Sequence, residues 1–387
     1  MKKYQATHPW ITFECDLRAA SHRVWLMLGE AQSKCEHIAG ALLTPDVALE
    51  MHQIYLVKGI FATTAIEGNP LNEEEVRSYL AGTLKLPPAQ QYIQQEMDNV
   101  EAALDEIFQQ TLQCAETALS PERVQIYNAL VLRDLELEDG VVAGAIRLKD
   151  VLVGDVYRGA PPEDCAYLLE RMCAWLNHET FCAQDDRRLI FGILRALLAH
   201  LYIAWIHPFG DGNGRTARLI EFEILTCSGV PSPAAHLLSD HYNRTRGEYY
   251  RQLDAASRSG GNIWPFLEYA LGGFLSGLRE QIERIRSQEL TVAWRDYVHS
   301  VFSAKSTKGD ERRRHLMLDM SQHETAVPLE KMRVISSRVA EHYAGKTSKT
   351  LARDLIELQK LDLIVKTPQG YRAHREIMLA FLPERRV

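Results

Sequence analysis

His207-Pro-Phe-Gly-Asp-Gly-Asn-Gly-Arg-Thr-Ala-Arg218 is the stretch around which the rest of this sequence is organised. It lies between two apolar runs, residues 189–206 and 219–227, which predict two buried helices. A connection between core helices is ordinarily a simple turn, but this one holds a histidine, a carboxylate, an asparagine, two arginines and three glycines. If this were only a glycine-rich connection with surface arginines, the presence of all these side chains together would be a coincidence. The stretch therefore indicates a functional loop.

The loop has the parts of a phosphate-binding site. Gly210, Gly212 and Gly214 allow successive backbone N–H groups to point into one concavity. At the start of a helix, those donors and the helix dipole favour an anion. Arg215 and Arg218 are three residues apart, so on a helix they share a face and can bind a polyphosphate together.

Three more side chains complete the predicted site. Asn213 adds a side-chain donor, and Asp211 is the only carboxylate of the loop. One carboxylate together with substrate phosphates is a usual way to hold Mg²⁺. His207, at the end of the preceding helix, can act as general base for an incoming hydroxyl. The sequence thus predicts a nucleotide-phosphate site with a base beside it.

The stretch resembles the signature of the Fic family, His-x-Phe-x-(Asp/Glu)-Gly-Asn-Gly-Arg-x-x-Arg, at every specified position. The resemblance implies a mainly α fold, a Fic-type helical bundle with a β-hairpin flap. It also implies an enzyme that transfers AMP from ATP to a Ser, Thr or Tyr hydroxyl of a protein. In that reaction His207 would deprotonate the hydroxyl, and Asp211 would coordinate Mg²⁺.

The same resemblance implies how the nucleotide is held. Gly212, Asn213 and Gly214 would bind the α-phosphate, while Arg215 and Arg218 would bind the β- and γ-phosphates. Tyr250 falls where the family lines the adenine pocket. A Tyr249-Tyr250 pair is also typical of a helix core, and Ser257 stands where relatives can carry an asparagine.

A second motif lies far upstream. Thr63-Thr-Ala-Ile-Glu67-Gly68 resembles the family's inhibitory pattern, (Ser/Thr)-x-x-x-Glu-(Gly/Asn). By itself this pattern is a common helix end with a glycine stop. The inhibitory interpretation depends on the presence of the Fic-like motif in the same chain. The resemblance implies that Glu67 pairs with Arg218, withdraws that arginine from the γ-phosphate and so restrains the enzyme. In some relatives the same glutamate assists removal of AMP, which is an alternative here.

Residues 144–160 predict a β-hairpin inside the helical domain. Two short strands, through residues 147–153 and 156–158, flank a Gly154-Asp155 turn. Exposed strand edges favour pairing with an extended peptide, so the hairpin is the predicted binding surface for the target protein. A purely structural ribbon is equally typical of this pattern without the family context.

Helix start and stop signals organise the remaining chain. They predict helices over residues 21–38, 45–66, 91–109, 242–256 and 264–287, with residues 1–18 irregular.

Charge divides the chain in two. Residues 290–387 carry 18 Lys and Arg against 12 Asp and Glu, a net of +6, whereas the whole chain has a net charge of −7. The charge difference therefore predicts a separate C-terminal domain (290–387). Within the remainder we predict an N-terminal helical region with the inhibitory helix (1–110) and a Fic catalytic core (111–289).

The C-terminal domain has the pattern of a small winged helix. Two short helices precede a wing that turns at residues 368–370. Lys349, Arg353, Lys366 and Arg372 could contact DNA phosphates through residues 290–387, but such modules also serve dimerisation or docking. A homodimer is suggested only by the family resemblance.

Composition excludes several other classes of protein. Seven cysteines without C-x-x-C spacing predict reduced thiols in a cytoplasmic protein rather than disulfides or a zinc site. The apolar runs look too short or too interrupted for a membrane span, so no membrane partner is predicted.

The function prediction keeps rivals from two classes. The same fold can transfer UMP, GMP or phosphocholine, because the motif contacts phosphates rather than the base. A nucleotide-sensing DNA-binding regulator is the rival without catalysis, although such a sensor need not retain His207.

Overall fold

The computed structural model describes residues 2–113, 118–153, 157–181, 186–323 and 325–379. The chain divides into two compact units, Met1–Glu283 and Arg284–Val387. The predicted boundary between residues 110 and 111 lies inside the first unit, and the predicted boundary at residue 290 lies close to the division between the units.

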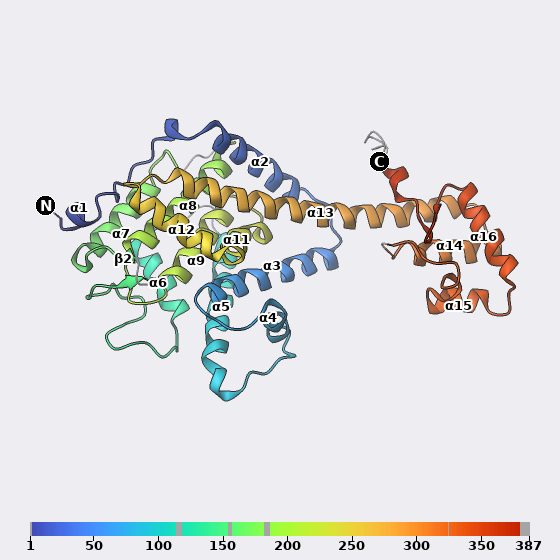
Figure 1. Cartoon of the computed structure of the whole chain (residues 1–387), viewed down its shortest axis with the longest axis horizontal. Helices are drawn as coiled ribbons and strands as arrows, with labels where there is room; N and C mark the ends of the chain where they lie inside the picture. The colour runs from blue at the N-terminus through green and yellow to red at the C-terminus, as the bar shows by residue number, and fades with distance from the viewer. Residues whose placement is uncertain (1, 114–117, 154–156, 182–185, 324, 380–387) are drawn as a thin grey trace. The chain divides into compact units, whose positions relative to one another are not determined.

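The first unit is helical except for one hairpin (Figure 1). Its elements are α1 (Tyr4–Thr7), α2 (His22–Ala39), α3 (Pro45–Ile66), α4 (Glu73–Leu80), α5 (Gln91–Gln113), α6 (Pro121–Val131), β1 (Leu152–Val153), β2 (Tyr157–Arg158), α7 (Pro162–Leu176), α8 (Arg188–Ile206), α9 (Asn213–Cys227), α10 (Ser232–Ala235), α11 (Leu237–Arg244), α12 (Arg246–Arg258) and the start of α13 (Trp264–Phe302).

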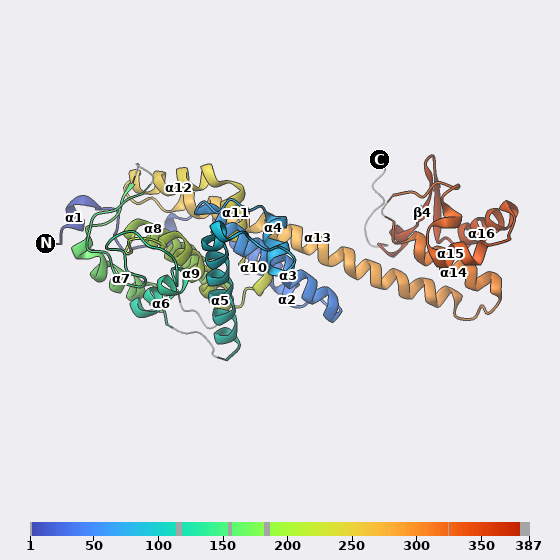
Figure 2. The ribbon, with the colours of Figure 1, turned by 90° about the horizontal axis from the view of Figure 1, so that it is seen from below.

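Helices α8 and α9 form the centre of the first unit, and the motif 207–218 comprises the loop between them and the first residues of α9. Helix α9 also packs against α3, α5 and α6 (Figures 1 and 2). Nearly every side chain of α9 is buried, polar ones included, because neighbouring helices surround it. This arrangement presents the beginning of α9 to side chains from α3 and α5.

Helix α8 corrects one expectation from the sequence. It is long and apolar enough to cross a membrane by length and composition, although we predicted that no run would be. However, 78% of its apolar window is buried inside the unit. A core helix of a soluble protein gives the same signal, and its packing against α9 supplies that explanation here.

Capping chemistry explains the predicted helices near the inhibitory motif. Pro45 occupies the first turn of α3, and α3 ends where Gly68 adopts a φ of 108°. Helix α4 begins with a capping box, in which Asn72 and Glu75 each accept a hydrogen bond from the other's backbone N–H. The predictions for residues 21–38 and 45–66 are confirmed to within one residue.

Three predicted helices differ from the structure. The helix predicted over residues 91–109 continues to Gln113 as α5. The helix predicted over residues 242–256 is divided between α11 and α12, because Thr245 leaves the helical conformation and its hydroxyl donates to the carbonyl of His241 at 2.7 Å. The helix predicted over residues 264–287 continues to Phe302 as α13. Of the segment predicted to be irregular, residues 2–18 are described, and they are irregular except for the single turn α1 and the start of a 3₁₀ turn, Leu17–Ala19.

The second unit has its own core. It contains the end of α13, α14 (Lys308–Met320), α15 (Ser337–Tyr343), α16 (Ser348–Lys360) and an antiparallel hairpin of β3 (Ile364–Thr367) and β4 (Gly370–Ala373). Its buried side chains include Trp294, Leu316, Val339 and Leu355. The two short helices and the hairpin lie where we predicted them, and the winged-helix interpretation stays a prediction.

Candidate functional site

The motif loop is held in a fixed shape by its own residues. His207 ends α8 in the left-handed conformation, with φ 49°, and Gly212 precedes α9 with φ 75°. Asn213 closes the loop, because its side chain accepts from the backbone N–H of Phe209 at 3.0 Å and donates to the Phe209 carbonyl at 2.9 Å. The sequence predicted this side chain as a phosphate donor, which stays a prediction, and the structure adds its role in shaping the loop.

Asn128 of α6 holds the loop from outside. Its buried amide donates to the Asp211 carbonyl at 2.9 Å and to the Thr216 hydroxyl at 3.2 Å. Its carbonyl oxygen accepts from the backbone N–H of Gly144 at 2.9 Å. One buried side chain therefore joins the motif to the beginning of segment 144–160.

Arg147 makes a second connection from that segment. Its buried guanidinium donates to the carbonyls of His207 and Lys149, each at 2.7 Å, and also to that of Ala160. The backbone N–H of Arg147 donates to the Pro208 carbonyl at 3.0 Å. Arg147 thus fixes the backbone of His207 and both ends of the hairpin segment at once.

His207 is partly buried and is neutral at physiological pH. Burial, and then the positive charge of Arg147, lower the pKa of His207 to about 4. A neutral imidazole is the form that accepts a proton, so the environment maintains His207 as a base.

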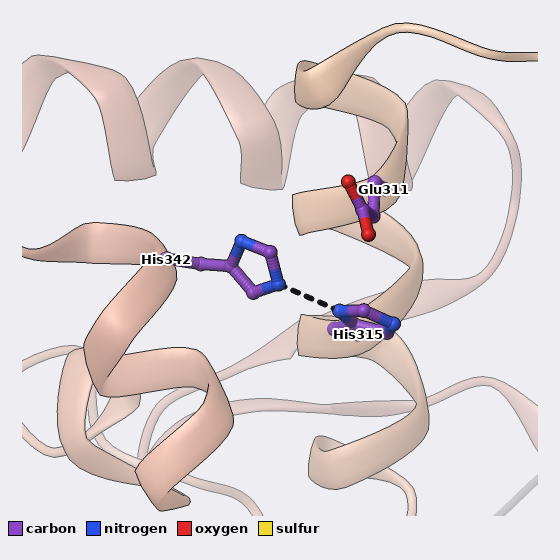
Figure 3. A group of neighbouring side chains, drawn as sticks. All are labelled: Glu311, His315 and His342. Carbon is purple, nitrogen blue, oxygen red and sulfur yellow. Dashed lines mark hydrogen bonds between the residues drawn. The ribbon is translucent and has the colours of Figure 1, made fainter.

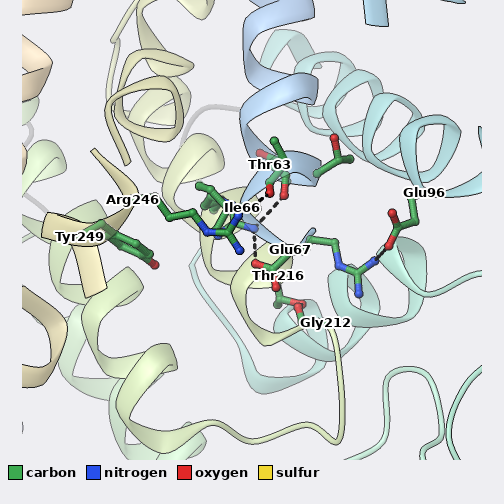
Figure 4. Close-up of polar contacts among 12 residues, drawn as sticks. Thr63, Ile66, Glu67, Glu96, Gly212, Thr216, Arg246 and Tyr249 are labelled. Atoms are coloured by element: carbon green, nitrogen blue, oxygen red, sulfur yellow. Dashed lines mark hydrogen bonds and ion pairs between the residues drawn. The ribbon is translucent and has the colours of Figure 1, made fainter. Parts of the chain in front are cut away.

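Arg218 is the most enclosed charge of the site. Its side chain is only 1% exposed, and its Nη2 donates to Glu67 Oε1 at 2.6 Å and to the Thr63 carbonyl at 2.9 Å. Figure 4 labels both acceptor residues, Thr63 and Glu67. The pair predicted from the two distant motifs is therefore present in the structure. Charge-assisted hydrogen bonds of this kind contribute about 1.5–3 kcal/mol.

Gly214 allows the carboxylate of Glu67 to approach the beginning of α9. A Cβ at this position would clash with Oε1 of Glu67 and would lie 3.2 Å from Nη1 of Arg218. The carboxylate therefore lies against the helix N-terminus, where an anion is stabilised by the first backbone N–H groups.

Glu67 is ionised in this position. Burial raises the pKa of Glu67, but the charge of Arg218 and the hydrogen bond from it lower that pKa below its ordinary value. The Glu67 side chain is still 30% exposed, so it can leave the pair without unfolding its surroundings.

Arg215 is held by a different carboxylate. Its Nη1 donates to Oε1 of Glu96, on α5, at 2.8 Å, and its Nη2 lies 3.3 Å from Oδ1 of Asp211. Asp211 also accepts from the backbone N–H of Gly212 at 2.5 Å and has a side chain 52% exposed. Each of the two arginines therefore faces one acidic side chain from the N-terminal helices.

Both arginines retain buried donors without an acceptor. Within the described part of the chain, Nε and Nη1 of Arg218 and Nε of Arg215 are buried and have no hydrogen-bond partner. Buried guanidinium nitrogens ordinarily find an acceptor. Their position beside the start of α9 indicates that an anionic ligand supplies it.

Tyr250 lies at the edge of the site, on α12. It is 45% exposed, and its hydroxyl donates to the Ile66 carbonyl at 3.4 Å. Its neighbour Tyr249 is buried and bonded to His200 Nε2 at 2.8 Å, with Glu221 on the other side of that imidazole at 3.4 Å. Of the tyrosine pair, Tyr250 is thus the one accessible to a ligand.

The predicted hairpin is present as β1 and β2, which pair antiparallel with Leu152 opposite Arg158, but its first strand covers only residues 152–153 of the predicted 147–153. The predicted Gly154-Asp155 turn lies outside the described residues. The base of the hairpin joins the motif directly, through a bridge between Ile146 and Phe209. Leu148 nearby is 93% exposed.

Sequence reasoning missed three residues that shape the site, Asn128, Arg147 and Glu96. Each comes from a different element, and none belongs to a local motif. A buried polar side chain in an apolar helix was the only available signal for Asn128, and the other two look like ordinary surface charges in the sequence.

A comparison with protein families matches residues 118–225 to the Fic/DOC family. Residues 118–225 are a Fic/DOC domain. The matched range covers α6 through most of α9, and so contains the hairpin and the motif loop.

Relatives of the Fic/DOC domain include two proteins named as protein adenylyltransferases. The chain is 34% identical over 215 residues to "Protein adenylyltransferase fic-1" of Caenorhabditis briggsae, which covers 54% of this chain and 38% of that protein. It is 28% identical over 210 residues to "Protein adenylyltransferase Fic" of Nematostella vectensis, covering 54% of this chain and 45% of that protein. The chain therefore spans less than half the length of these relatives.

Two solved structures share the fold. Fic-1 of C. elegans aligns with a TM-score of 0.55 and 25% identity, over 68% of this chain and 73% of that one. A Fic family protein of Desulfovibrio desulfuricans G20 aligns with a TM-score of 0.56 and 20% identity, over 92% of this chain and 97% of that one. The mainly α, Fic-type fold predicted from the motif is confirmed.

Proposed function

We propose that this chain is a protein adenylyltransferase that transfers AMP from ATP to a Ser, Thr or Tyr hydroxyl of a protein, itself included. The names of its relatives support this activity. The observation that carries the proposal is the set of buried arginine donors without an acceptor at the beginning of α9, with neutral His207 in the same loop. Together they provide a polyphosphate site beside a base.

In this reaction the target hydroxyl attacks the α-phosphorus, its proton passes to His207, and pyrophosphate leaves. Backbone N–H groups of residues 212–214 receive the α-phosphate, since the first donors of a helix have no partner within it. Arg218 and Arg215 receive the β- and γ-phosphates through planar, forked donors. These contacts place the α-phosphate in line for attack.

Asp211 is the residue we assign to Mg²⁺. Its half-exposed carboxylate lies on the loop beside Arg215, and a hard oxygen donor next to phosphates fits this ion. A bound Mg²⁺ would supply charge neutralisation at the phosphates. Arg215 shares the same carboxylate, so it keeps Asp211 oriented toward the phosphate site.

Glu67 restrains this activity in our proposal. Its carboxylate occupies the helix N-terminus and one face of Arg218, where phosphate oxygens would otherwise bind. Two negative groups cannot share that position without repulsion. Release of Glu67 therefore sets whether ATP binds in a productive geometry.

The target protein binds along residues 144–160 in this proposal. The exposed side chains of Leu148 and Leu152 and the free strand edges of the hairpin suit an extended peptide. Because Arg147 joins the hairpin base to His207, a peptide added there approaches the base.

The test is incubation of the full chain with labelled ATP and Mg²⁺, followed by intact-mass analysis. Freeing Arg218 by Glu67→Gly should raise AMP transfer about 10- to 100-fold, which is the worth of a charge-assisted hydrogen bond. His207→Ala in the same background should reduce transfer by about 100-fold or more. A Glu67→Gly protein that transfers nothing from mixed nucleotides to itself or to a lysate would refute the proposal.

The same mass analysis distinguishes the alternatives that share the site. A mass increase of UMP, GMP or phosphocholine would change the transferred group, and loss of AMP from a modified protein would reveal the reverse activity. The rival DNA-binding function has one supporting observation, the exposed Lys349 and Arg353 on one face of α16 with Lys366 on β3. A salt-dependent shift of DNA by the full chain would support it.

A further inference from the structure

The second unit holds a cluster of potential metal ligands that the proposed activity does not use. Glu311 and His315 lie one turn apart on α14, and His342 lies on α15. One ligand atom from each of the three lies within 4.8 Å of the others. Figure 3 shows the two imidazole rings facing each other, with Glu311 one turn away on the same helix as His315.

Packing does not explain this cluster. The buried core of the second unit includes Leu316 and Met317, which follow His315 in the sequence, and Val339, which lies three residues before His342. None of the three cluster residues belongs to that core. Glu311 is exposed, and the two histidines are only partly buried. The cluster therefore lies at the surface, above a core that is complete without it.

The distance between the histidines is close to that of a shared metal ion. His315 Nδ1 and His342 Nε2 are 2.8 Å apart. Zinc–imidazole bonds are about 2.0–2.1 Å, which places two nitrogens of a tetrahedral site about 3.3 Å apart. The two nitrogens would have to move apart by only about half an ångström, which small side-chain rotations allow, to bind one metal ion together.

The types of donor select the class of ion. Two imidazole nitrogens and a carboxylate suit zinc and the neighbouring transition metals, whereas Ca²⁺ and Mg²⁺ prefer oxygen alone.

Nearby positive charge is partly neutralised. Arg338 is paired with Asp319, whose Oδ2 lies 3.3 Å from its Nε. The carboxylate of Glu311 supplies the one negative charge of the cluster itself.

We propose that Glu311, His315 and His342 bind one divalent transition-metal ion, with zinc the best fit, and that the ion joins α14 to α15. Three protein ligands leave one position open to water or to a fourth ligand. This site is independent of the nucleotide site, because it lies wholly in the second unit.

The test uses the tag-free full chain, stripped of metal and titrated with Zn²⁺ in a calorimeter, with Co²⁺ absorption as a second readout. We expect one equivalent of Zn²⁺ to bind and tetrahedral Co²⁺ bands to appear. His342→Ala should weaken binding at least about tenfold, since loss of even an outer partner of a ligand has that effect. Glu311→Gln should weaken it less and still shift the Co²⁺ bands.

His323→Ala is the matched control, because His323 is exposed in the same unit and outside the cluster. It should bind Zn²⁺ like the parent. Equal loss in His323→Ala and His342→Ala, or no binding by the parent, would overturn the proposal. Circular dichroism of each variant tests whether it is folded. We expect His315→Gln, which retains the size of the side chain, to lose the Co²⁺ bands, and bands that persist in it would contradict the proposal.

Discussion

At the scale of single residues, two neighbouring charges of opposite sign act on the pKa of His207, in addition to its burial. Arg147 lowers the pKa of His207, and Glu67 raises it. The two residues also hold the two sides of the site, since Arg147 binds the His207 backbone and Glu67 binds Arg218. Their replacement should therefore shift the same imidazole in opposite directions.

We predict that His207 stays neutral down to about pH 5, well below the ordinary histidine pKa of about 6.5. Arg147→Gln should raise its pKa above about 4, and Glu67→Gly should lower it further. NMR of histidine-labelled protein measures this, with His207→Gln identifying the signal. A parent resonance that titrates near pH 6.5, or shifts of the same sign in both variants, would contradict the prediction.

At the scale of elements, α3 and α5 each bring one carboxylate to one arginine of α9. Glu67 ends α3 and faces Arg218, while Glu96 lies within α5 and faces Arg215. Only the first pair has a recognisable motif in the sequence. The second pair places a carboxylate of the N-terminal helices at the other arginine as well.

We predict that Glu96→Gln strengthens ATP binding. In the Glu67→Gly background it should lower the KM for ATP about twofold to fivefold with little change in kcat, because a partly exposed ion pair contributes up to about 1 kcal/mol. Steady-state kinetics measures this, and Glu106→Gln, an exposed change on the same helix, is the control. A higher KM would mean that Glu96 instead orients Arg215 for the phosphates.

Local sequence signals predicted the elements well where their cause is local. Start and stop signals marked both ends of α3, with a proline in its first turn and a glycine after Glu67. The motif 207–218 marked the loop, His207 and both arginines, because they are close together in the sequence, His207 at the end of α8 and the arginines at the start of α9.

The remainder depends on contacts between distant segments. Asn128 and Glu96 reach the loop only because α6 and α5 pack against α9. The contact of the Asn213 side chain with the Phe209 backbone was not predicted, because that backbone becomes available only when the loop closes. The length of α13 was underestimated because its continuation past residue 287 is supported by the second unit's core, through Trp294 and Val298.

At the scale of the whole molecule, the chain has two cores joined by one continuous helix. Along α13, Ile285 is buried and the next buried side chain is Trp294. Between them, Leu290 and Val292 are only partly buried, and Arg375 donates to the Thr291 hydroxyl at 3.4 Å. Because the two units have separate cores, we expect each to respond to its own ligand.

We predict two transitions in calorimetry of the full Glu67→Gly chain. A non-hydrolysable ATP analogue with Mg²⁺ should raise only the transition of the first unit, and Zn²⁺ only that of the second. At a ligand concentration of about 100 times Kd each gains about 2.7 kcal/mol, and the smaller unit should move further in Tm because its unfolding entropy is smaller. His342→Ala should remove the zinc shift and leave the nucleotide shift intact, whereas one transition moved by both ligands would show that the two cores unfold as one.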